Sequence, residues 1–371
     1  MTGKLSIQQI GLYKLLIPLK EPFVISLGPQ YNAESIIVVI KTDAGITGFG
    51  ECSPYMSING ESLDTCFIVG QYFAKALKEK DPLDIKECIK TMDKTIYGNS
   101  SIKSAFDMAL NDIAAQHANV PLYKFLGGEN NKELVTDMTI SIGDPQKMAA
   151  DAVKFKEHGF RFIKVKLGET KEKDVARIKA IRKAIGMEIP LRIDANQGWK
   201  LKTAIEILNE LKDFNIQYCE EPIARWNFMK LKKVKNHSPI PVMADESCSD
   251  HHDAKRLVDL KACDMLNVKL GKSSGIYNAK KTIAIAEKAN LPMQLGAFME
   301  SRLGITAAAH LALCSDQIKY CDFDTPLMFT EDPVSGGIMY EKSGVMKVPE
   351  SVGLGATIDQ SYLEKFEKII I

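Results

Sequence analysis

The amino-acid sequence predicts an α/β protein, a (β/α)8-type barrel with an N-terminal α+β capping domain that the C-terminal tail completes. Three observations lead to this prediction. After residue 131, eight short apolar runs alternate with segments of helical periodicity, as expected for a parallel barrel. The first 130 residues instead show strand patterns followed by helix patterns, which is typical of an α+β unit. The length of 371 residues suits two domains of about 100–200 residues each.

The capping domain is expected to comprise residues 1–130. Three runs have the composition of strands, at residues 5–17, 34–41 and 46–51. Three segments of helical periodicity follow them, at residues 62–79, 83–95 and 101–117. The pair Gly127-Gly128 is a breaker that ends this region.

The barrel is expected to comprise residues 131–332. Its eight strands are predicted at residues 134–141, 162–167, 190–194, 216–220, 241–245, 264–269, 292–295 and 318–321. The remaining residues, 333–371, are rich in glycine, and we expect them to be irregular and to pack back on the capping domain.

Composition excludes several classes of protein. Lys plus Arg number 48 and Asp plus Glu number 47, so the chain lacks the basic excess of a nucleic-acid-binding face. No apolar run approaches the roughly 20 residues of a membrane-spanning helix, and the N-terminus lacks the apolar stretch of a signal peptide. The eight cysteines are scattered, which indicates free thiols in a cytoplasmic protein. We therefore expect neither nucleic-acid nor membrane partners.

Charged residues end five consecutive predicted strands of the barrel: Lys166, Asp194, Glu220, Asp245 and Lys269. Successive members of this series are 28, 26, 25 and 24 residues apart. One strand-helix unit of a barrel of about 250 residues has this length, so the five side chains are expected at one rim. Active sites of barrel enzymes lie at that rim.

Three of these residues predict a metal site. Asp194, Glu220 and Asp245 would repel one another if they converged without a cation. Three carboxylates provide oxygen ligands only, which suits Mg²⁺, and no histidine is placed to complete a zinc site. We therefore expect one Mg²⁺ in each subunit.

The two lysines of the series predict the reaction. Lys166 precedes the metal-binding strands and Lys269 follows them, so the α-carbon of a metal-bound carboxylate would lie between two catalytic bases. Lys164 lies on the same face of its strand as Lys166, where it would lower the pKa of Lys166 and bind the substrate carboxylate. These roles imply proton abstraction next to a carboxylate with a metal-stabilised enediolate. Return of the proton from the opposite side would invert the carbon centre.

Five motifs resemble those of the mandelate racemase/muconate lactonising branch of the enolase superfamily. They are Lys164-Val165-Lys166, Asp194-Ala195-Asn196, Glu220-Glu221-Pro222, Ala244-Asp245-Glu246-Ser247 and Asn267-Val268-Lys269. Within that branch, Asp322-Phe323-Asp324 resembles the Asp-x-Asp signature of dipeptide epimerases. The resemblance covers nearly the whole chain and implies Mg²⁺-dependent epimerisation of dipeptides from the L,L to the L,D form. We also expect a homo-oligomer.

The resemblance implies further substrate contacts. Asp322 and Asp324 would bind the ammonium group of a dipeptide by charge-assisted hydrogen bonds. Thr139 matches a threonine that contacts substrate in this family. Gly28 stands where epimerases for Ala-Glu carry an arginine, and residues 21–34 contain no arginine. This difference favours a small or hydrophobic second residue in the dipeptide over glutamate.

Alternative functions use the same barrel. An o-succinylbenzoate synthase, an N-acylamino acid racemase or a muconate-type cycloisomerase would keep the lysines but bind no free ammonium, so the two acids Asp322 and Asp324 disfavour them. A non-catalytic barrel would not require the lysines and carboxylates together. The segment Gly271-Lys272-Ser273 ends like a phosphate-binding loop, but Leu266 stands where that motif begins with glycine.

Overall fold

The eight predicted parallel strands form one sheet in the computed structural model, which describes residues 4–371. In chain order they are β5 (Met138–Ile140), β6 (Ile163–Lys166), β7 (Leu191–Asp194), β8 (Ile216–Glu220), β9 (Val242–Ala244), β10 (Met265–Lys269), β11 (Met293–Gly296) and β12 (Ile318–Asp322). A bridge between Thr136 and Cys321 brings β12 beside the start of β5. The sheet therefore curls into a nearly closed barrel, and the predicted fold class is confirmed.

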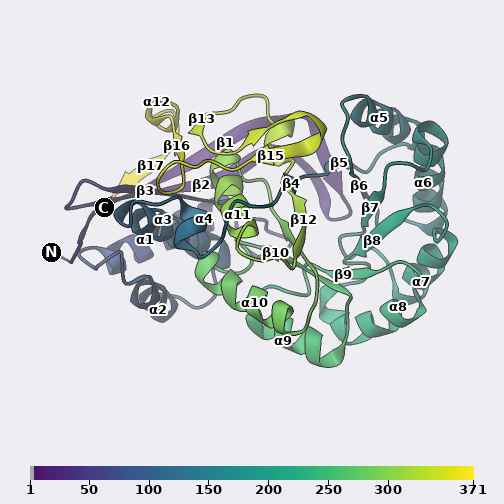
Figure 1. Ribbon diagram of the computed structural model, residues 1–371, viewed down its shortest axis with the longest axis horizontal. Coiled ribbons are helices and arrows are strands. Elements are labelled where there is room, and N and C mark those ends of the chain that lie inside the picture. Colours follow the sequence, from purple (N-terminus) through teal and green to yellow (C-terminus); the bar gives the residue numbers. More distant parts are fainter. Residues whose placement is uncertain (1–3) are drawn as a thin grey trace.

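Helices cover the outside of the barrel (Figure 1). They are α5 (Pro145–Glu157), α6 (Lys171–Ile185), α7 (Leu201–Glu210), α8 (Leu231–His237), α9 (His251–Leu260), α10 (Ile276–Lys288) and α11 (Arg302–Ala312). The 3-10 helix η1 (Arg225–Lys230) precedes α8, and η2 (Thr325–Met328) follows β12. Several of these helices begin after a residue whose side chain caps the first turn, such as Asp144, Thr170, Asp250 and Ser301.

Strand register aligns the ends of the barrel strands. Lys166 pairs with Asp194, and Asp194 pairs with Glu220 on the next strand. On the other side of the barrel, Lys269 and Asp322 both pair with Gly296. Charged residues from strands far apart in the sequence therefore meet at the same rim.

The capping domain is an antiparallel sheet with helices packed beside it. Its strands are β1 (Ile7–Ile25), β2 (Gly28–Thr42) and β3 (Thr47–Cys52), and its helices are α1 (Leu63–Leu77), α2 (Ile85–Thr95), α3 (Ser100–His117) and α4 (Leu122–Phe125). A buried apolar cluster that includes Ile36, Phe73 and Phe106 joins the sheet to these helices. A larger cluster fills the space between the barrel strands and their helices.

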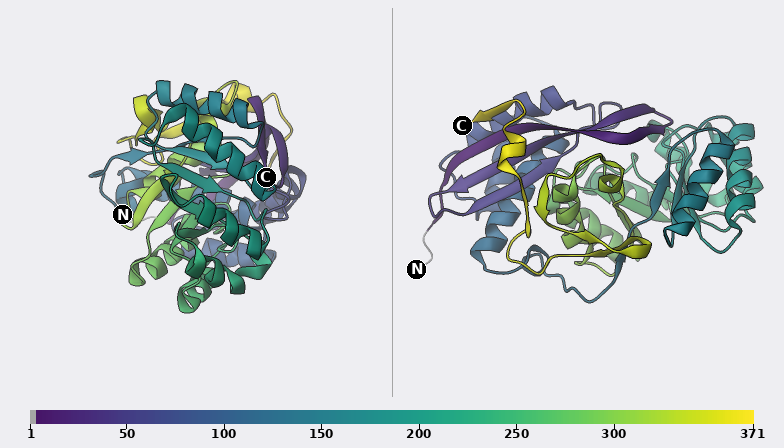
Figure 2. Two further views of the ribbon diagram at one scale, coloured as in Figure 1. Left: turned by 90° about the vertical axis from the view of Figure 1, so that its right-hand side faces the viewer. Right: turned by 90° about the horizontal axis from the view of Figure 1, so that it is seen from above.

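The first strand is longer than the sequence suggested. Residues 18–33 lie outside the predicted strands, but β1 and β2 continue through them as a hairpin in which Ile25 pairs with Gly28. The pairing is irregular between Pro18 and Phe23, and it resumes because Phe23, Val24 and Ile25 find backbone partners on β2. Figure 2 shows this long hairpin reaching from the capping domain to the barrel. Its tip therefore lies over the rim.

The C-terminal tail is also more regular than expected. It contains β13 (Val334–Gly336), β14 (Met339–Tyr340), η3 (Lys342–Gly344), β15 (Val345–Lys347), β16 (Ala356–Ile358), α12 (Gln360–Leu363) and β17 (Lys368–Ile370). β15 pairs with β4 (Leu134–Val135), and β17 pairs with β1 as an edge strand of the capping sheet. The domain limits at residues 130 and 332 stay predictions, and residues 1–3 of the predicted capping domain lie outside the described residues. Within the described chain, no helix is both long enough and apolar enough to cross a membrane.

Glu51, in β3, ties the capping domain to the barrel. Its carboxylate accepts hydrogen bonds from Ser301 N at 2.8 Å, Ser301 Oγ at 2.7 Å and Gly304 N at 2.8 Å. These donors lie at the N-terminus of α11, where unpaired backbone N–H groups favour a negative charge. Burial raises the pKa of this carboxyl, which is shielded from solvent. The contact therefore holds the cap over the barrel through a buried polar bridge.

Replacing Glu51 by alanine is expected to lower the free energy of unfolding by about 2–4 kcal/mol, because it leaves buried donors unpaired. Urea denaturation followed by circular dichroism measures this loss. The matched control is Glu34→Ala, which removes an exposed carboxylate from the same sheet. Equal stability of the two variants would contradict the proposed bridge.

Candidate active site

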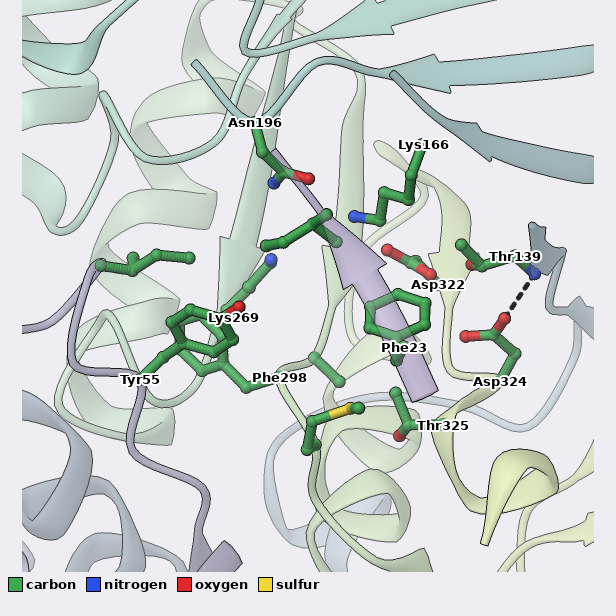
Figure 3. A pocket seen from close by; sticks show the side chains of 14 residues that line it. Phe23, Tyr55, Thr139, Lys166, Asn196, Lys269, Phe298, Asp322, Asp324 and Thr325 are labelled. Atoms are coloured by element: carbon green, nitrogen blue, oxygen red, sulfur yellow. Dashed lines mark hydrogen bonds between the residues drawn. The ribbon is translucent and has the colours of Figure 1, made fainter. Parts of the chain in front are cut away.

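A cavity at the carboxyl ends of the barrel strands brings five predicted residues together. They are Thr139, Lys166, Lys269, Asp322 and Asp324. Figure 3 shows their side chains around the same space. Apolar side chains complete the walls: Phe23 and Ile25 come from the hairpin tip, Tyr55 and Ile58 from the segment after β3, and Phe298 and Met299 from the segment after β11. Gly28 lies in the hairpin beyond this wall and does not line the cavity.

The three predicted metal ligands lie beneath the cavity. Asp194, Glu220 and Asp245 are fully buried at or just after the ends of β7, β8 and β9. Burial and the neighbouring carboxylates of Asp194 and Asp245 raise the pKa of Glu220 to about 7. The carboxylates therefore repel one another, and their neutralisation requires positive charge.

Lysines provide part of that charge. Lys166 Nζ lies 2.7 Å from Asp194 Oδ2, and Lys269 Nζ lies 2.9 Å from Asp245 Oδ2. Burial alone would raise the pKa of the Asp194 carboxyl, but Lys166 and the nearby Lys164 together hold it below its usual value. The carboxylates of Asp194 and Asp245 thus lie in a buried site with positive charge close by.

The donor set fits a divalent cation. All three groups are oxygen donors, which matches the preference of Mg²⁺. Asp245 Oδ2 accepts no well-aligned hydrogen bond within residues 4–371, although Lys269 Nζ is close to it. Glu246 Oε2 is likewise buried without a hydrogen-bond partner in the described part of the chain. Buried oxygens without donors are compatible with a cation in this place.

The two predicted bases face one cavity from different sides. Lys166 comes from the end of β6 and Lys269 from the end of β10, and Figure 3 shows both amino groups pointing into the central space. Burial lowers the pKa of Lys269, but Asp245 and Glu220 outweigh burial and raise it above the usual lysine value. This direction is the opposite of the one expected for a base. A cation that neutralised these two carboxylates would remove the cause of the rise.

Lys164 lies deeper than predicted. It is fully buried and does not line the cavity. Its Nζ lies 2.7 Å from Glu220 Oε2, 2.7 Å from Asp322 Oδ2 and 3.3 Å from Asp194 Oδ2. Three protein carboxylates therefore surround the ammonium of Lys164, and its predicted contact with a substrate carboxylate stays a prediction.

One wall of the cavity is formed by Thr139, Asp322 and Asp324. Asp324 Oδ2 accepts a hydrogen bond from the backbone N of Thr139 at 2.6 Å, which Figure 3 marks. Burial and the neighbouring Asp322 raise the pKa of Asp324 to about 7. Burial also acts against ionisation of Asp322, but Lys164 and Lys166 outweigh it and bring the pKa of Asp322 to about 2. This wall is therefore acidic and faces the apolar side of the cavity.

A layer of polar residues beneath the rim was not predicted. Asn267 Nδ2 donates to Glu220 Oε1 at 2.7 Å, and Gln294 Nε2 donates to Glu220 Oε2 at 3.3 Å. The hydroxyl of Tyr218 donates to Gln294 Oε1 in turn. These contacts orient Glu220, as partners of metal ligands commonly do. The sequence did carry a signal for these residues: each is a polar residue two positions before the end of an apolar strand. Residues two positions apart on a strand point to the same face, so each side chain lies on the same face as the residue that ends its strand.

The contact between Lys272 and Asp245 was also not predicted from the sequence. Lys272 is buried, and its ammonium pairs with the carboxylate of Asp245. The same ammonium donates to Asn267 O at 2.9 Å. This lysine faces a carboxylate, which agrees with the rejection of a phosphate-binding loop in this segment.

Family models match both parts of the chain. Residues 9–127 match the mandelate racemase / muconate lactonizing enzyme N-terminal domain, and residues 147–362 match the enolase C-terminal domain-like family. The D-Ala-D/L-Ala epimerase of Cytophaga hutchinsonii is 56% identical over 98% of this chain and 99% of its own length. The N-succinyl-L-Arg/Lys racemase of Bacillus cereus is 33% identical over 97% and 98%.

Solved structures agree with this relationship. A dipeptide epimerase from Cytophaga hutchinsonii, in complex with Mg and D-Ala-L-Val, has a TM-score of 0.98 at 56% identity and covers 99% of this chain and 100% of its own. A dipeptide epimerase from Enterococcus faecalis, in complex with Mg and L-Leu-L-Tyr, has a TM-score of 0.92 at 38% identity and covers 95% and 99%. The resemblance read from the motifs is confirmed: the chain belongs to the dipeptide epimerase group of the mandelate racemase/muconate lactonizing enzyme family, in the enolase superfamily.

Proposed function

We propose that this protein is an isomerase that epimerises dipeptides from the L,L to the L,D form by moving the α-proton of the C-terminal residue. The observation that carries the proposal is one cavity lined by Lys166, Lys269, Asp322 and Asp324. Two ammonium groups on different sides of a carbon centre suit inversion, and two carboxylates suit a free amino group. The dipeptide epimerases among the relatives support this reaction.

Asp194, Glu220 and Asp245 are the proposed Mg²⁺ ligands. Their burial, their oxygen donors and the Mg complexes of two similar structures support this assignment. When bound, Mg²⁺ would stabilise negative charge that develops on the substrate carboxylate. Asn267 and Gln294 hold Glu220, and Lys272 holds Asp245.

Lys166 and Lys269 are the proposed catalytic residues. In the forward direction, one lysine removes the proton from the α-carbon, and the other lysine donates a proton from the opposite side. The roles exchange for the reverse reaction, because the product then presents its proton to the second lysine. The ring centres of Phe23 and Phe298 lie 5.8 Å and 4.9 Å from the Nζ atoms of Lys166 and Lys269, so each lysine has an apolar neighbour at the cavity.

Asp322 and Asp324 are proposed to bind the ammonium group of the substrate, with Thr139 beside them. Asp324 is held in place by the backbone of Thr139. The dipeptide then spans the cavity, with its carboxylate toward the metal ligands and its amino group toward this wall. Lys164 pairs with both Glu220 and Asp322 and so links the proposed metal ligands to this acidic wall.

The proposed substrates have a small or hydrophobic second residue. Phe23, Ile25, Ile58 and Phe298 give the cavity an apolar wall, and no arginine lines it. Ligands in two similar structures, D-Ala-L-Val and L-Leu-L-Tyr, are consistent with this preference. An N-acylamino acid racemase or a cycloisomerase remains the alternative that an experiment must exclude.

The test is α-proton exchange. The protein is incubated with Mg²⁺ in D₂O together with a library of L,L-dipeptides, and mass spectrometry records deuterium gain. We expect gain on dipeptides with Ala, Val, Leu or Tyr as the second residue and little on those with Glu. Exchange only on N-acylamino acids or succinylbenzoate precursors would overturn the proposal while keeping the barrel chemistry.

Asp324→Asn is expected to raise KM for dipeptides by about 10–100-fold, the effect of losing a charge-assisted hydrogen bond of 1.5–3 kcal/mol. The affinity for Mg²⁺ should change far less, because Asp324 contacts none of the proposed metal ligands. Steady-state kinetics and isothermal titration with Mg²⁺ separate the two quantities. Equal losses of both would assign Asp324 to the metal.

We also infer an assembly of identical chains. Large apolar side chains are exposed away from the cavity, including Tyr97 and Trp226, whose exposed fractions are 96% and 77%. Exposed apolar surface of this kind supports a subunit interface. Light scattering that gave the mass of a single chain at micromolar concentration would contradict this inference.

A cytoplasmic location is proposed on the basis of the cysteines. All eight are free thiols, and all but Cys314 are buried. Free thiols are typical of a reducing compartment.

A further inference from the structure

A third carboxylate lies next to Asp322 and Asp324 but, unlike them, is not part of the cavity lining. One oxygen each of Asp137, Asp322 and Asp324 lies within 4.8 Å of an oxygen of the other two. Asp137 is fully buried, two residues before Thr139. Neither the motifs nor the strand-end pattern pointed to it, because it precedes β5 instead of following it.

The spacing of these oxygens suits an ammonium group. An ammonium donates three hydrogen bonds in nearly tetrahedral directions, at N···O distances of about 2.8 Å. Three acceptors at that distance lie roughly 4.6 Å from one another by tetrahedral geometry. The three oxygens lie within 4.8 Å of one another, so a single ammonium group could reach all of them.

Only one of the two oxygens of Asp137 is occupied. Asp137 Oδ2 accepts a hydrogen bond from Arg192 Nη1 at 2.8 Å. Asp137 Oδ1 is buried and has no hydrogen-bond partner among residues 4–371. A buried carboxylate oxygen without a donor is costly, and an N–H donor on a ligand beside the two further carboxylates would satisfy it.

Arg192 is fixed as the counterion of Asp137. It is 1% exposed, and its guanidinium lies 4.3 Å from the ring centre of Phe162 and 5.1 Å from that of Tyr320. Its Nε donates to Gln217 Oε1 at 3.0 Å. These contacts leave the guanidinium little freedom, and they hold one oxygen of Asp137 so that the other faces away from Arg192.

The three carboxylates have fewer cationic partners than acidic groups. Two cations contact them, Lys164 at Asp322 and Arg192 at Asp137, and Lys164 is shared with Asp194 and Glu220. A substrate ammonium would supply a further positive charge here, and an acylated amine would not. We propose that Asp137, held by Arg192, is a third carboxylate of the ammonium subsite and makes the enzyme select substrates with a free amino group. This inference rests on the proposed function.

The experiment compares two ligands in the full-length protein with Mg²⁺ present. L-Ala-L-Ala serves as the substrate, and N-acetyl-L-Ala-L-Ala serves as a competitor without a free amino group. For Asp137→Asn we expect KM for L-Ala-L-Ala to rise by about 10–100-fold, with a smaller change in kcat. The inhibition constant of the acetylated competitor and the affinity for Mg²⁺ should change by less than about threefold, since neither depends on the subsite charge.

Asp137→Asn leaves Arg192 without a counterion, so the double variant Asp137→Asn with Arg192→Gln is measured beside it. The double variant replaces the buried ion pair by two amides and is expected to show the same loss of selectivity. The control is Asp174→Asn, which removes the carboxylate from another buried pair: Asp174 contacts Arg177 at 2.7 Å and Trp199 and does not belong to the acidic cluster. It should lower stability without changing the ratio of the two affinities.

Two results would overturn the inference. One is an unchanged KM for L-Ala-L-Ala in both Asp137 variants. The other is an equal loss of affinity for the free and the acetylated ligand, which assigns Asp137 a structural role. Failure of the proposed function is recognised separately, because the wild-type protein would then exchange the α-proton of no dipeptide at all.

Discussion

Replacing Lys269 by alanine is expected to reduce epimerisation by about 10²–10⁴-fold, the contribution of a positioned acid or base. The variant should still exchange the α-proton of one substrate epimer, because Lys166 still faces the cavity. It should not exchange that of the other epimer, whose proton points toward the missing amine. NMR spectra of an L,L- and an L,D-dipeptide in D₂O measure the two exchange rates separately.

Lys166→Ala is the reciprocal experiment. We expect it to preserve exchange of the epimer that Lys269→Ala loses. Lys202→Ala, which removes a lysine with a side chain that is 91% exposed on α7, is the control and should leave both rates unchanged. Full epimerisation by either active-site variant, or loss of the same epimer in both, would contradict two separate bases. Circular dichroism checks that each variant is folded, since both lysines neutralise buried carboxylates.

Glu220→Gln is expected to weaken Mg²⁺ binding by more than about 100-fold. Loss of a residue that only hydrogen-bonds to a metal ligand already costs up to about 100-fold in metal affinity, and loss of a ligand itself should cost more. The carboxylate of Glu220 accepts hydrogen bonds from Lys164 and Asn267, both at 2.7 Å. An amide in its place would set an N–H₂ group against one of these donors and would rotate out of position. Isothermal titration with Mg²⁺ measures the affinity, and epimerisation should be lost with it.

The thermal stability of the same variant gives a second readout. Mg²⁺ that binds only the folded state raises the melting temperature of the wild-type protein. Glu220→Gln should show no such rise, whereas Glu210→Gln, on the surface at the end of α7, should match the wild-type protein. A normal Mg²⁺-dependent rise in Glu220→Gln would exclude Glu220 as a ligand.

The rim residues could be predicted because the repeat of a parallel barrel is regular. Lys166, Asp194, Glu220 and Lys269 each end an apolar strand, and the strand register then brings those ends together. Sequence spacing alone carries this information, since successive parallel strands start from the same side of the sheet. The fold class followed from the same repeat.

The layer beneath the rim could not be predicted in the same way. Asn267 contacts Glu220 across the barrel, at a distance of 47 residues in sequence, and Arg192 contacts Asp137 at a distance of 55. Which polar side chain meets which depends on how the strands tilt and stagger around the barrel. A polar residue inside an apolar strand shows only that some partner exists.

The hairpin formed by β1 and β2 shows another limit of the sequence. Phe23 and Ile25 reach the cavity because the strands continue past Pro18, where a proline usually interrupts a ladder. Here the register shifts after Pro18 and pairing resumes at Phe23. Whether pairing resumes depends on how β1 and β2 align with each other, which the sequence of either strand alone does not reveal. The substrate preference was inferred from the missing arginine, while the residues that form the apolar wall came from the structure.

The central claim is inversion by two bases on opposite sides of one carbon, and isotope content at early conversion tests it most directly. The wild-type protein is incubated with Mg²⁺ and L-Ala-L-Val in D₂O, and substrate and product are separated before a tenth of the substrate is consumed. We predict an L,D product that carries deuterium at the α-carbon of Val, and recovered substrate that still carries mostly protium. Equal deuterium in both would indicate a single exchanging base, and protium retained in the product would indicate direct return of the same proton. Either result would contradict the two-lysine account.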